Sequence, residues 1–462
     1  MSLQFITGNS GNGKTKYLFN RIVKEAKANP RDNYLVIVPE QFTMQTQRQL
    51  VDLSENKVIM NIDVLSFKRL AYRVFDELGI TNLTVLEETG KNLVLRKLAA
   101  QEADKLGVIG RNLNRIGYIS EVKSLLSELV QYNISPEELG RYIASGMLSD
   151  TLSDKLKDVL VLYEAFEKFM QDKYITAEEI LNVLSNVAEE SAILRNSVIA
   201  FDEFTGFTPI QNQLIKKLFV ISKKIYVTLT IDCREDIFKS RGMQELFDMP
   251  KRTVKSLTEM AAFYGIEVEE PIILDKNYRL AENEELSFME QQLFRKRRCS
   301  FKKVPKHIHI DCLRDPKQEL TKIARRINEL VRNENLRYRD IAIVTGDVNI
   351  YAGYVREIFD KYNIPYFIDA TQEILFHPFI EFIRSIPDIA AQNFSADAVF
   401  RFLRCGFSEL LDSEIDVLEN YVLACGVRGK SAWDKKWVRL PKHKAGYDLE
   451  LLNQSREYII CL

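Results

Sequence analysis

The fold of this protein is decided by an eight-residue stretch near its start, Gly8-Asn9-Ser10-Gly11-Asn12-Gly13-Lys14-Thr15. It follows a short strand pattern at 4–7 and precedes a helical pattern that opens at Lys16. A G-x-x-x-x-G-K-T loop between a strand and a helix is typical of a phosphate site, because its glycines let backbone amides surround phosphate oxygens. We therefore expect all eight residues to bind a nucleotide, with Lys14 at the β- and γ-phosphates and Thr15 on Mg²⁺.

A second acidic element supports this interpretation. The apolar run 197–201 ends in two adjacent carboxylates, Asp202 and Glu203. Such a strand end is typical of an Asp that completes the Mg²⁺ shell and a catalytic Glu that polarises the attacking water. An ordinary strand-exit turn has the same pattern, and that alternative stays open. If the site is real, we expect the first strand to lie beside the strand that ends at Asp202.

The bulk properties limit the classes of protein to consider. The chain has 462 residues, enough for roughly two to four domains. Hydrophobic residues make up 46% and charged residues 28%, and the six cysteines are too scattered for a zinc site or a disulfide framework. No run approaches the ~18 apolar residues of a membrane-spanning helix, and no signal-peptide pattern opens the chain. These features predict a folded cytoplasmic protein with no membrane partner. The net charge of −1 leaves nucleic-acid binding to local charge distribution.

Six further segments carry a resemblance to a known family. They are residues 38–43, 64–75, 201–211, 274–279, 338–344 and 364–369. Together with the glycine loop, and in this order, they resemble the AddB family, the B subunits of the AddAB helicase-nuclease. The first four are similar to helicase motifs Ia, Ib, II and IV. The last two resemble the opening of a second helicase-like core domain.

The resemblance implies an α/β fold: a P-loop NTPase with a superfamily 1 helicase-like core, a parallel sheet with helices on both faces, a helical insertion and a partial second core domain. The helical periodicity of 93–188 also favours such an insertion. The expected parts are a first core domain at 1–90 and 190–285, a helical insertion at 91–189, a basic linker at 286–304, the start of a second core domain at 305–375 and a truncated helical insertion at 376–462.

The resemblance also implies roles for single residues. Arg279 would face the γ-phosphate of the nucleotide. Short polar or basic side chains in motifs Ia and Ib would touch DNA phosphates, namely Gln41, Thr43, Ser66 and Lys68. Thr205 stands where active relatives carry the glutamine that couples nucleotide to DNA.

A second candidate for DNA binding is the run 294–306, which contains seven basic residues and no acid. Cationic side chains there could track a DNA backbone, and the four consecutive ones are Arg295, Lys296, Arg297 and Arg298. A solvated linker has the same composition, so this alternative also stays open.

The function implied by the resemblance is the N-terminal helicase-like part of the B subunit of an ATP-dependent helicase/exonuclease. That enzyme processes double-strand DNA breaks for homologous recombination and scans for a hotspot sequence. The implied cofactors are ATP and Mg²⁺. The implied partners are an AddA-type motor and nuclease subunit, double-stranded DNA ends and single-stranded DNA. We expect the family's nuclease domain and cysteine-held iron–sulfur cluster beyond Leu462, in the full-length protein. Two alternatives remain: an autonomous ATP-driven superfamily 1 DNA helicase and a P-loop kinase of a small molecule.

Overall fold

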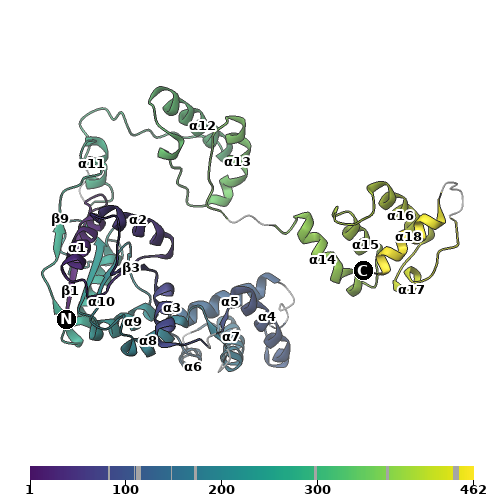
Figure 1. Cartoon of the computed structure of the whole chain (residues 1–462), viewed down its shortest axis with the longest axis horizontal. Helices are drawn as coiled ribbons and strands as arrows, with labels where there is room; N and C mark the ends of the chain where they lie inside the picture. The colour runs from purple at the N-terminus through teal and green to yellow at the C-terminus, as the bar shows by residue number, and fades with distance from the viewer. Residues whose placement is uncertain are drawn as a thin grey trace. The chain divides into compact units, whose positions relative to one another are not determined.

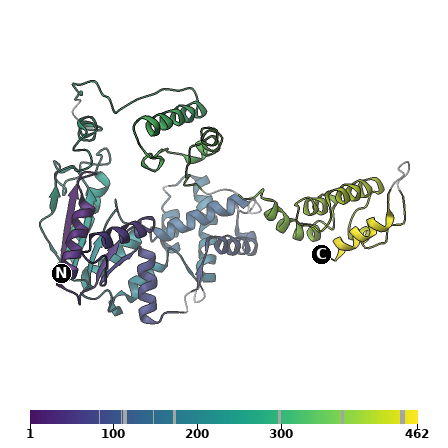
Figure 2. The same cartoon turned by 45° about the horizontal axis from the view of Figure 1, so that its top comes forward.

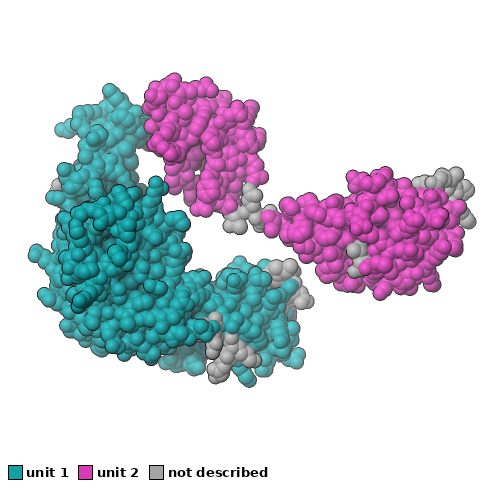
Figure 3. All heavy atoms as spheres, viewed as in Figure 1, with its two compact units in different colours: residues 1–309 teal, residues 310–462 magenta. Residues whose placement is uncertain are grey.

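The chain forms two compact units, residues 1–309 and residues 310–462 (Figure 1). Figure 3 colours the two units separately. The computed structural model describes residues 1–81, 84–108, 110, 116–146, 148–170, 174–295, 299–370, 374–440 and 447–461.

A parallel sheet organises the first unit (Figure 2). Within the described residues it has seven strands in the spatial order β3-β2-β6-β7-β1-β8, and β9 also pairs with β1. These strands are β1 (Ser2–Gly8), β2 (Tyr34–Ile37), β3 (Ile62–Leu65), β6 (Val198–Phe201), β7 (Lys224–Thr230), β8 (Glu267–Val268) and β9 (Ile272–Leu274). The α/β fold with a parallel sheet is thus as expected.

Alternate residues of the central strands supply two apolar cores, because successive side chains of a strand point to opposite faces. One face packs on α1 (Lys14–Ala28) and α2 (Thr43–Leu53), through Ile6, Val36 and Ala200. The other face packs on α3 (Phe67–Leu78), α8 (Ile180–Val187), α9 (Pro209–Ile221) and α10 (Asp248–Phe263), through Phe5, Ile37 and Phe201. The sheet is therefore buried on both sides, which explains why its strands are apolar runs rather than alternating patterns.

The order of the strands departs from expectation in one respect. β7 lies between β1 and β6, so the first strand is not beside the strand that ends at Asp202. The expected adjacency was wrong because a local sequence pattern does not specify which strand pairs with which. All three strands are parallel, however, so the loops after Gly8, Phe201 and Thr230 leave the same edge of the sheet.

A helical part with its own core is inserted between β3 and β6. It contains α4 (Glu88–Gln101), η2 (Ala103–Lys105), α5 (Ile116–Gln131), α6 (Pro136–Ala144) and α7 (Asp150–Met170). Its buried side chains include Leu95, Leu126, Leu162 and Phe166. Two short strands, β4 (Val85–Leu86) and β5 (Ile175–Thr176), pair where the chain enters and leaves it. The first unit also contains η1 (Glu40–Phe42), η4 (Ala188–Glu190) and α11 (Glu284–Gln292).

The second unit begins with a helix pair. The two α-helices are α12 (Pro316–Asn333) and α13 (Val348–Lys361), and the short 3₁₀ helix η5 (Tyr338–Asp340) lies between them in the chain. Their shared core includes Leu320, Ile327 and Phe359. The segments 338–344 and 364–369, which were expected to open a second core domain, form no strand in the described residues, and Val344 and Phe367 are 92% and 88% exposed. A strand needs the hydrogen bonds of a neighbouring strand. No described segment supplies them here, so the α/β character expected for this region is not seen.

The remaining described residues form a helical body. Its elements are α14 (Pro378–Ala391), α15 (Ala396–Leu403), α16 (Asp412–Cys425), α17 (Lys430–Trp433) and α18 (Leu449–Ile460). They enclose an aromatic-rich core that includes Phe402, Tyr421, Trp433 and Trp437. Of the helices in the described residues, none combines the length and the apolar character that crossing a bilayer requires.

Candidate functional site

The glycine loop after β1 adopts a conformation that requires glycine. Gly11 and Gly13 have φ values of 90° and 79°, in the left-handed region. A Cβ atom on Gly11 would lie 2.8 Å from both Cβ of Arg279 and Oδ1 of Asn277. Glycine here therefore lets the segment around Arg279 approach the loop closely.

Two buried asparagines brace the loop from within. Asn9 Oδ1 accepts a hydrogen bond from the backbone N–H of Cys233 at 3.1 Å, and Asn9 Nδ2 donates to Glu290 Oε1 at 2.7 Å. Asn12 Nδ2 donates to the carbonyl oxygen of Leu274 at 2.5 Å. The Nδ2 groups of both side chains are thus bonded inside the protein, whereas Asn12 Oδ1 is buried without a hydrogen-bond partner in the described residues.

Lys14, the first residue of α1, is turned back onto its own loop. Its Nζ donates to the carbonyl oxygens of Gly8 at 3.1 Å and Asn9 at 3.0 Å. Burial lowers the pKa of Lys14, and the nearby Arg279 adds to this, while Asp202 and Glu203 act in the opposite direction. The ammonium group is thus held within the site.

The next residue, Thr15, faces both carboxylates that follow β6. Its Oγ1 lies 3.4 Å from Asp202 Oδ1 and 3.4 Å from Glu203 Oε1. Thr228, in the middle of β7, donates a short hydrogen bond to the same Asp202 oxygen. Glu203 itself has φ 64°, an uncommon conformation for a residue with a side chain. Residues from α1, β7 and the end of β6 therefore converge on one point.

Asp202 fits a role as a cation ligand. Its side chain is buried, and Oδ2 has no hydrogen-bond partner in the described part of the chain. Burial raises the pKa of Asp202, and repulsion from Glu203 adds to this despite the bonds from Thr228 and Thr15. A buried carboxylate with one unsatisfied oxygen beside a threonine hydroxyl suits Mg²⁺, which takes oxygen ligands and is usually held by one or two carboxylates plus substrate phosphates. Within the described residues no cluster of three acidic, histidine or cysteine side chains could hold a metal alone.

The segment after β9 forms the opposite wall of the site. The backbone N–H of Tyr278 donates to the carbonyl oxygen of Gly11 at 3.0 Å, and Asn277 Nδ2 donates to that of Ser10 at 3.2 Å. The guanidinium of Arg279 lies 3.5 Å from Ser10 Oγ. A cavity of about 730 Å³ opens between this wall, the loop, the carboxylates and α2, and it is lined in part by Lys14, Thr15, Asp202, Glu203 and Arg279. The residues predicted from the glycine loop, and from the segments that are similar to motifs II and IV, thus meet around one space.

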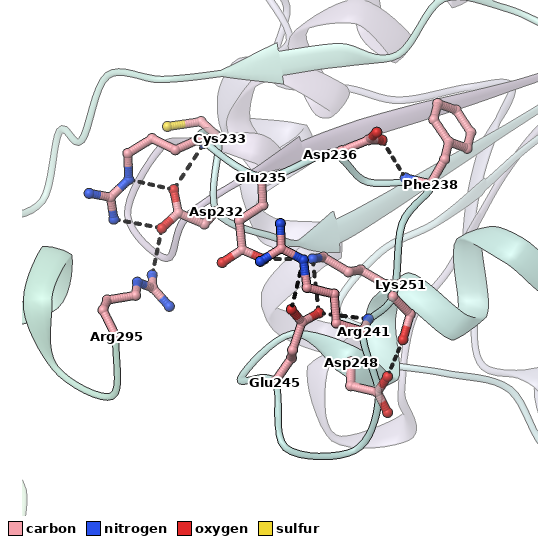
Figure 4. A network of polar contacts seen from close by, with 12 residues as sticks. Asp232, Cys233, Glu235, Asp236, Phe238, Arg241, Glu245, Asp248, Lys251 and Arg295 are labelled. Atoms are coloured by element: carbon pink, nitrogen blue, oxygen red, sulfur yellow. Dashed lines mark hydrogen bonds and ion pairs between the residues drawn. The ribbon is translucent and has the colours of Figure 1, made fainter. Parts of the chain in front are cut away.

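The loop after β7 links this site to the predicted basic run (Figure 4). Asp232 is buried and receives two hydrogen bonds from the Arg234 guanidinium, at 2.9 and 2.6 Å, and an ion pair from Arg295 at 2.7 Å. Burial alone would raise the pKa of Asp232, but the bonds from Arg234 and the charge of Arg295 lower it overall. Arg295 also lies over the ring of Phe247, 4.9 Å from its centroid.

Arg295 is therefore largely enclosed by protein, with a side chain that is 14% exposed. The other three members of the predicted cationic cluster, Lys296, Arg297 and Arg298, lie outside the described residues. DNA binding by this run stays a prediction.

The start of α10 is fixed by a second part of the same network (Figure 4). Lys251 is buried and pairs with Glu235 at 2.6 Å and Glu245 at 3.3 Å. Two residues further along, Thr253 Oγ1 donates to the carbonyl oxygen of Thr205 at 3.1 Å. Helix α10 thereby holds the loop that carries Glu203.

The motif Ia and Ib candidates divide into two kinds. Thr43 and Ser66 are buried, and their hydroxyls donate to the backbone oxygen and the carboxylate of Glu40, respectively. Ser66 also caps α3 by accepting from the N–H of Arg69 at 3.3 Å. Gln41 and Lys68 have exposed side chains. For all four residues DNA contact stays a prediction, and the exposed pair is better placed for it.

Sequence reasoning missed three residues that the site uses. Thr228 binds Asp202, Asp232 holds two arginines, and Asn277 bonds the glycine loop. The sequence did contain a signal for Thr228. It is a polar residue in an apolar strand, β7, and such a residue is a candidate for facing a site at the end of the sheet. Arg295, the second partner of Asp232, and Ser10, the partner of Asn277, are distant in sequence and gave no such signal.

Comparison with known proteins gives consistent matches. Residues 5–290 match a family model described as ADDB, N-terminal. Along its whole length the chain is 39% identical to a protein of Lachnoclostridium phytofermentans that is named as the B subunit of an ATP-dependent helicase/deoxyribonuclease, of which it covers 40%. Proteins of the same name are 34% identical in Clostridium acetobutylicum (95% of this chain, 38% of the relative) and 33% identical in Clostridioides difficile (99% and 40%). The chain thus spans about two fifths of the length of these curated relatives.

Proposed function

Because this chain belongs to the ADDB N-terminal family, we propose that it is the helicase-like N-terminal part of the B subunit of a DNA-break-processing helicase and deoxyribonuclease, and that it binds ATP, Mg²⁺ and DNA. The family and the names of the relatives support this proposal, since those proteins are named as subunits of ATP-dependent helicase/deoxyribonucleases. A P-loop NTPase core of the superfamily 1 helicase type belongs to the same proposal.

The observation that carries the nucleotide part is the meeting of Thr15, Asp202 and Arg279 around one cavity. The loop amides would hold phosphate oxygens at the N-terminus of α1, where the helix dipole favours negative charge. Lys14 would exchange its bonds to Gly8 and Asn9 for bonds to the β- and γ-phosphates. Arg279 would approach the γ-phosphate from the opposite wall.

Thr15 and Asp202 would hold Mg²⁺, because their oxygens are adjacent and Asp202 Oδ2 lacks a partner in the described residues. Bound Mg²⁺ would neutralise charge on the phosphate oxygens. Glu203, 3.4 Å from the Thr15 hydroxyl, would accept a proton from the attacking water if hydrolysis occurs.

The DNA part of the proposal rests on the family. Gln41 and Lys68 are the exposed side chains through which DNA contact is proposed, and double-stranded ends and single strands are the proposed forms of DNA. An AddA-type motor and nuclease subunit is the proposed partner. Scanning for a recombination hotspot, and an iron–sulfur cluster in the full-length protein, are further parts of this proposal.

An autonomous helicase is a weaker candidate, although Glu203 lies close to Thr15 as hydrolysis would require. At position 205 the backbone carbonyl is bonded to Thr253, and no glutamine is present to couple nucleotide to DNA. Stimulation of ATP hydrolysis by single-stranded DNA, in the full-length protein without its partner, would favour this candidate. The family match disfavours a small-molecule kinase.

The nucleotide part is tested by thermal unfolding of this chain with and without ATP–Mg²⁺. Saturating ligand should raise the melting temperature by several degrees, since a ligand at about 100 times its Kd adds about 2.7 kcal/mol to stability. Lys14→Ala should abolish the rise. Lys24→Ala, on an exposed position of the same helix, should retain it. An equal rise in both variants would refute the assignment.

A further inference from the structure

The helical body of the second unit carries an exposed basic segment, residues 428–439, which we call the basic loop. Its cations are Arg428, Lys430, Lys435, Lys436 and Arg439, and all five side chains are exposed. The segment contains one acid, Asp434. Among the described residues none of the five cations forms an ion pair, whereas Arg384, Arg401 and Arg404 of the same body each contact carboxylates. The basic loop therefore presents positive charge that these residues do not compensate.

The basic loop is held rigidly although most of it is neither helix nor strand. Trp433 and Trp437 are buried, and their indole N–H groups donate to the carbonyl oxygens of Phe394 at 3.1 Å and Ala432 at 3.0 Å. Asn453 of α18 bonds both the backbone N–H and the carbonyl oxygen of Trp437, each at 2.9 Å. Two buried rings and the side-chain amide of Asn453 thus hold the backbone segment that carries the cations.

A second buried residue of α18, Arg456, also bonds the backbone of the basic loop. Arg456 is 5% exposed, and its Nη1 donates to the carbonyl oxygen of Trp433 at 2.9 Å. At the other end, Tyr421 donates to the carbonyl oxygen of Arg439 at 2.7 Å. Anchored in this way, the loop would lose little conformational entropy when its cations meet a partner.

The chemistry of the loop favours a phosphate backbone over unpaired bases. Binding to single strands relies on aromatic rings that stack on bases, yet both aromatic residues of the loop are buried in the core of the body. Exposed cations without exposed rings suit a regular array of phosphates, and duplex DNA offers one negative charge per ~1.7 Å of its axis.

We propose that the basic loop binds the phosphate backbone of double-stranded DNA without reading its sequence. This inference rests on the proposed function, in which the protein acts on DNA, and it assigns part of that contact to five residues. Lys435 and Lys436, adjacent to the two anchoring tryptophans, form the centre of the contact.

The test compares two double variants of the 462-residue chain that remove the same charge. In Lys435→Gln/Lys436→Gln the lost cations are unpaired. In Arg384→Gln/Arg404→Gln the lost cations are also exposed, since each arginine side chain is 49% exposed, but both are already paired with carboxylates. Affinity for a labelled blunt-ended duplex is measured by fluorescence anisotropy from about 50 to 200 mM salt. Thermal unfolding of each variant verifies that it is folded.

The lysine pair should reduce the slope of log K against log salt concentration by about 2, since each phosphate contact contributes about 0.9. The arginine pair should leave it unchanged. Equal slopes in the lysine variant and the parent would overturn the inference, as would an equal loss in both variants. Tighter binding of a single strand of the same length, lost in the lysine variant, would overturn the assignment to duplex. A parent that binds no DNA would also overturn the inference, while stabilisation by ATP–Mg²⁺ would still support the nucleotide part of the proposed function.

Discussion

The hydroxyl of Thr15 lies 3.4 Å from a carboxylate oxygen of Asp202, although the two residues are 187 positions apart in the chain. Their strands are not neighbours, because β7 runs between β1 and β6 and contributes Thr228 to the same carboxylate. The sheet therefore brings three separate segments to one edge, and the geometry of the proposed nucleotide site depends on how that edge is stabilised.

Replacing Asp202 by Asn should stabilise the nucleotide-free protein near neutral pH, by about 1 kcal/mol. Burial, and then repulsion from Glu203, raise the pKa of Asp202. A carboxyl group with a raised pKa stabilises the fold fully below its unfolded pKa, and this contribution is lost as the pH rises through the folded pKa. Urea unfolding at several pH values should show less decline with rising pH in Asp202→Asn than in the parent. The same variant should lose the Mg²⁺-dependent part of stabilisation by ATP.

The matched control is Asp76→Asn, which changes an exposed carboxyl group on α3. It should alter neither the pH profile nor the response to Mg²⁺. If Asp202→Asn destabilises the nucleotide-free protein at all pH values, the charge of Asp202 is already satisfied without a cation, and its role as a ligand is contradicted.

Gly11→Ala should weaken nucleotide binding more than it weakens the fold. Its φ of 90° makes alanine strained, at a cost of about 1 kcal/mol or more. Its Cβ would also collide with Arg279 and Asn277, at 2.8 Å, and so displace the opposite wall. Gly79→Ala provides the comparison, since Gly79 has φ 67° but open space around it. Isothermal titration with ATP–Mg²⁺ should show weaker binding for Gly11→Ala alone; the same affinity in both variants would mean that this close approach is irrelevant to the ligand.

Arg295→Ala should cost about 1–3 kcal/mol of stability, because Asp232 would stay buried with Arg234 as its remaining cationic partner. The control is Arg252→Ala. The Arg252 side chain is 56% exposed and pairs with Asp248, so removing this ion pair should cost about 0–1 kcal/mol.

The pKa of Asp232 is lowered in the folded protein, so the contribution of its carboxylate to stability is present above its unfolded pKa and is lost as the pH falls through the folded pKa. Chemical unfolding between about pH 3 and 7 measures both effects. A cost no greater than that of Arg252→Ala, together with weaker DNA binding, would instead favour a DNA-binding role for Arg295.

The glycine loop and the strand before Asp202 could be predicted from the sequence because the information that specifies each of them is local. A strand, a glycine loop and a helix follow one another within 28 residues at the start of the chain, and the buried strand at 198–201 is a continuous apolar run. The order of strands could not be predicted, because β1 finds its neighbours at 224–230 and 267–274. The segments 338–344 and 364–369, expected to open a second core domain, form no strand in the described residues, because a strand depends on a partner and not only on its own pattern.

The surroundings of single side chains were harder to predict from the sequence, for a related reason. Ser66 and Thr43 are hydroxyl residues at helix starts, where a backbone or carboxylate partner competes with any external ligand. Arg295 belongs to a basic run in the sequence but pairs with Asp232, 63 positions earlier, which makes it part of the interior. Exposure decides which polar side chains remain available, and it depends on the tertiary fold.

The position of β1 in the sheet has a consequence for how the protein is made. The glycine loop leaves the ribosome well before its neighbours do, because both strands that flank β1, and the segment around Arg279, are encoded more than 200 residues later. At roughly 5–20 residues per second, translation leaves the loop without its walls for on the order of ten seconds or longer. A nascent chain would thus complete this site late, only after both β7 and β9 have emerged and paired with the first strand.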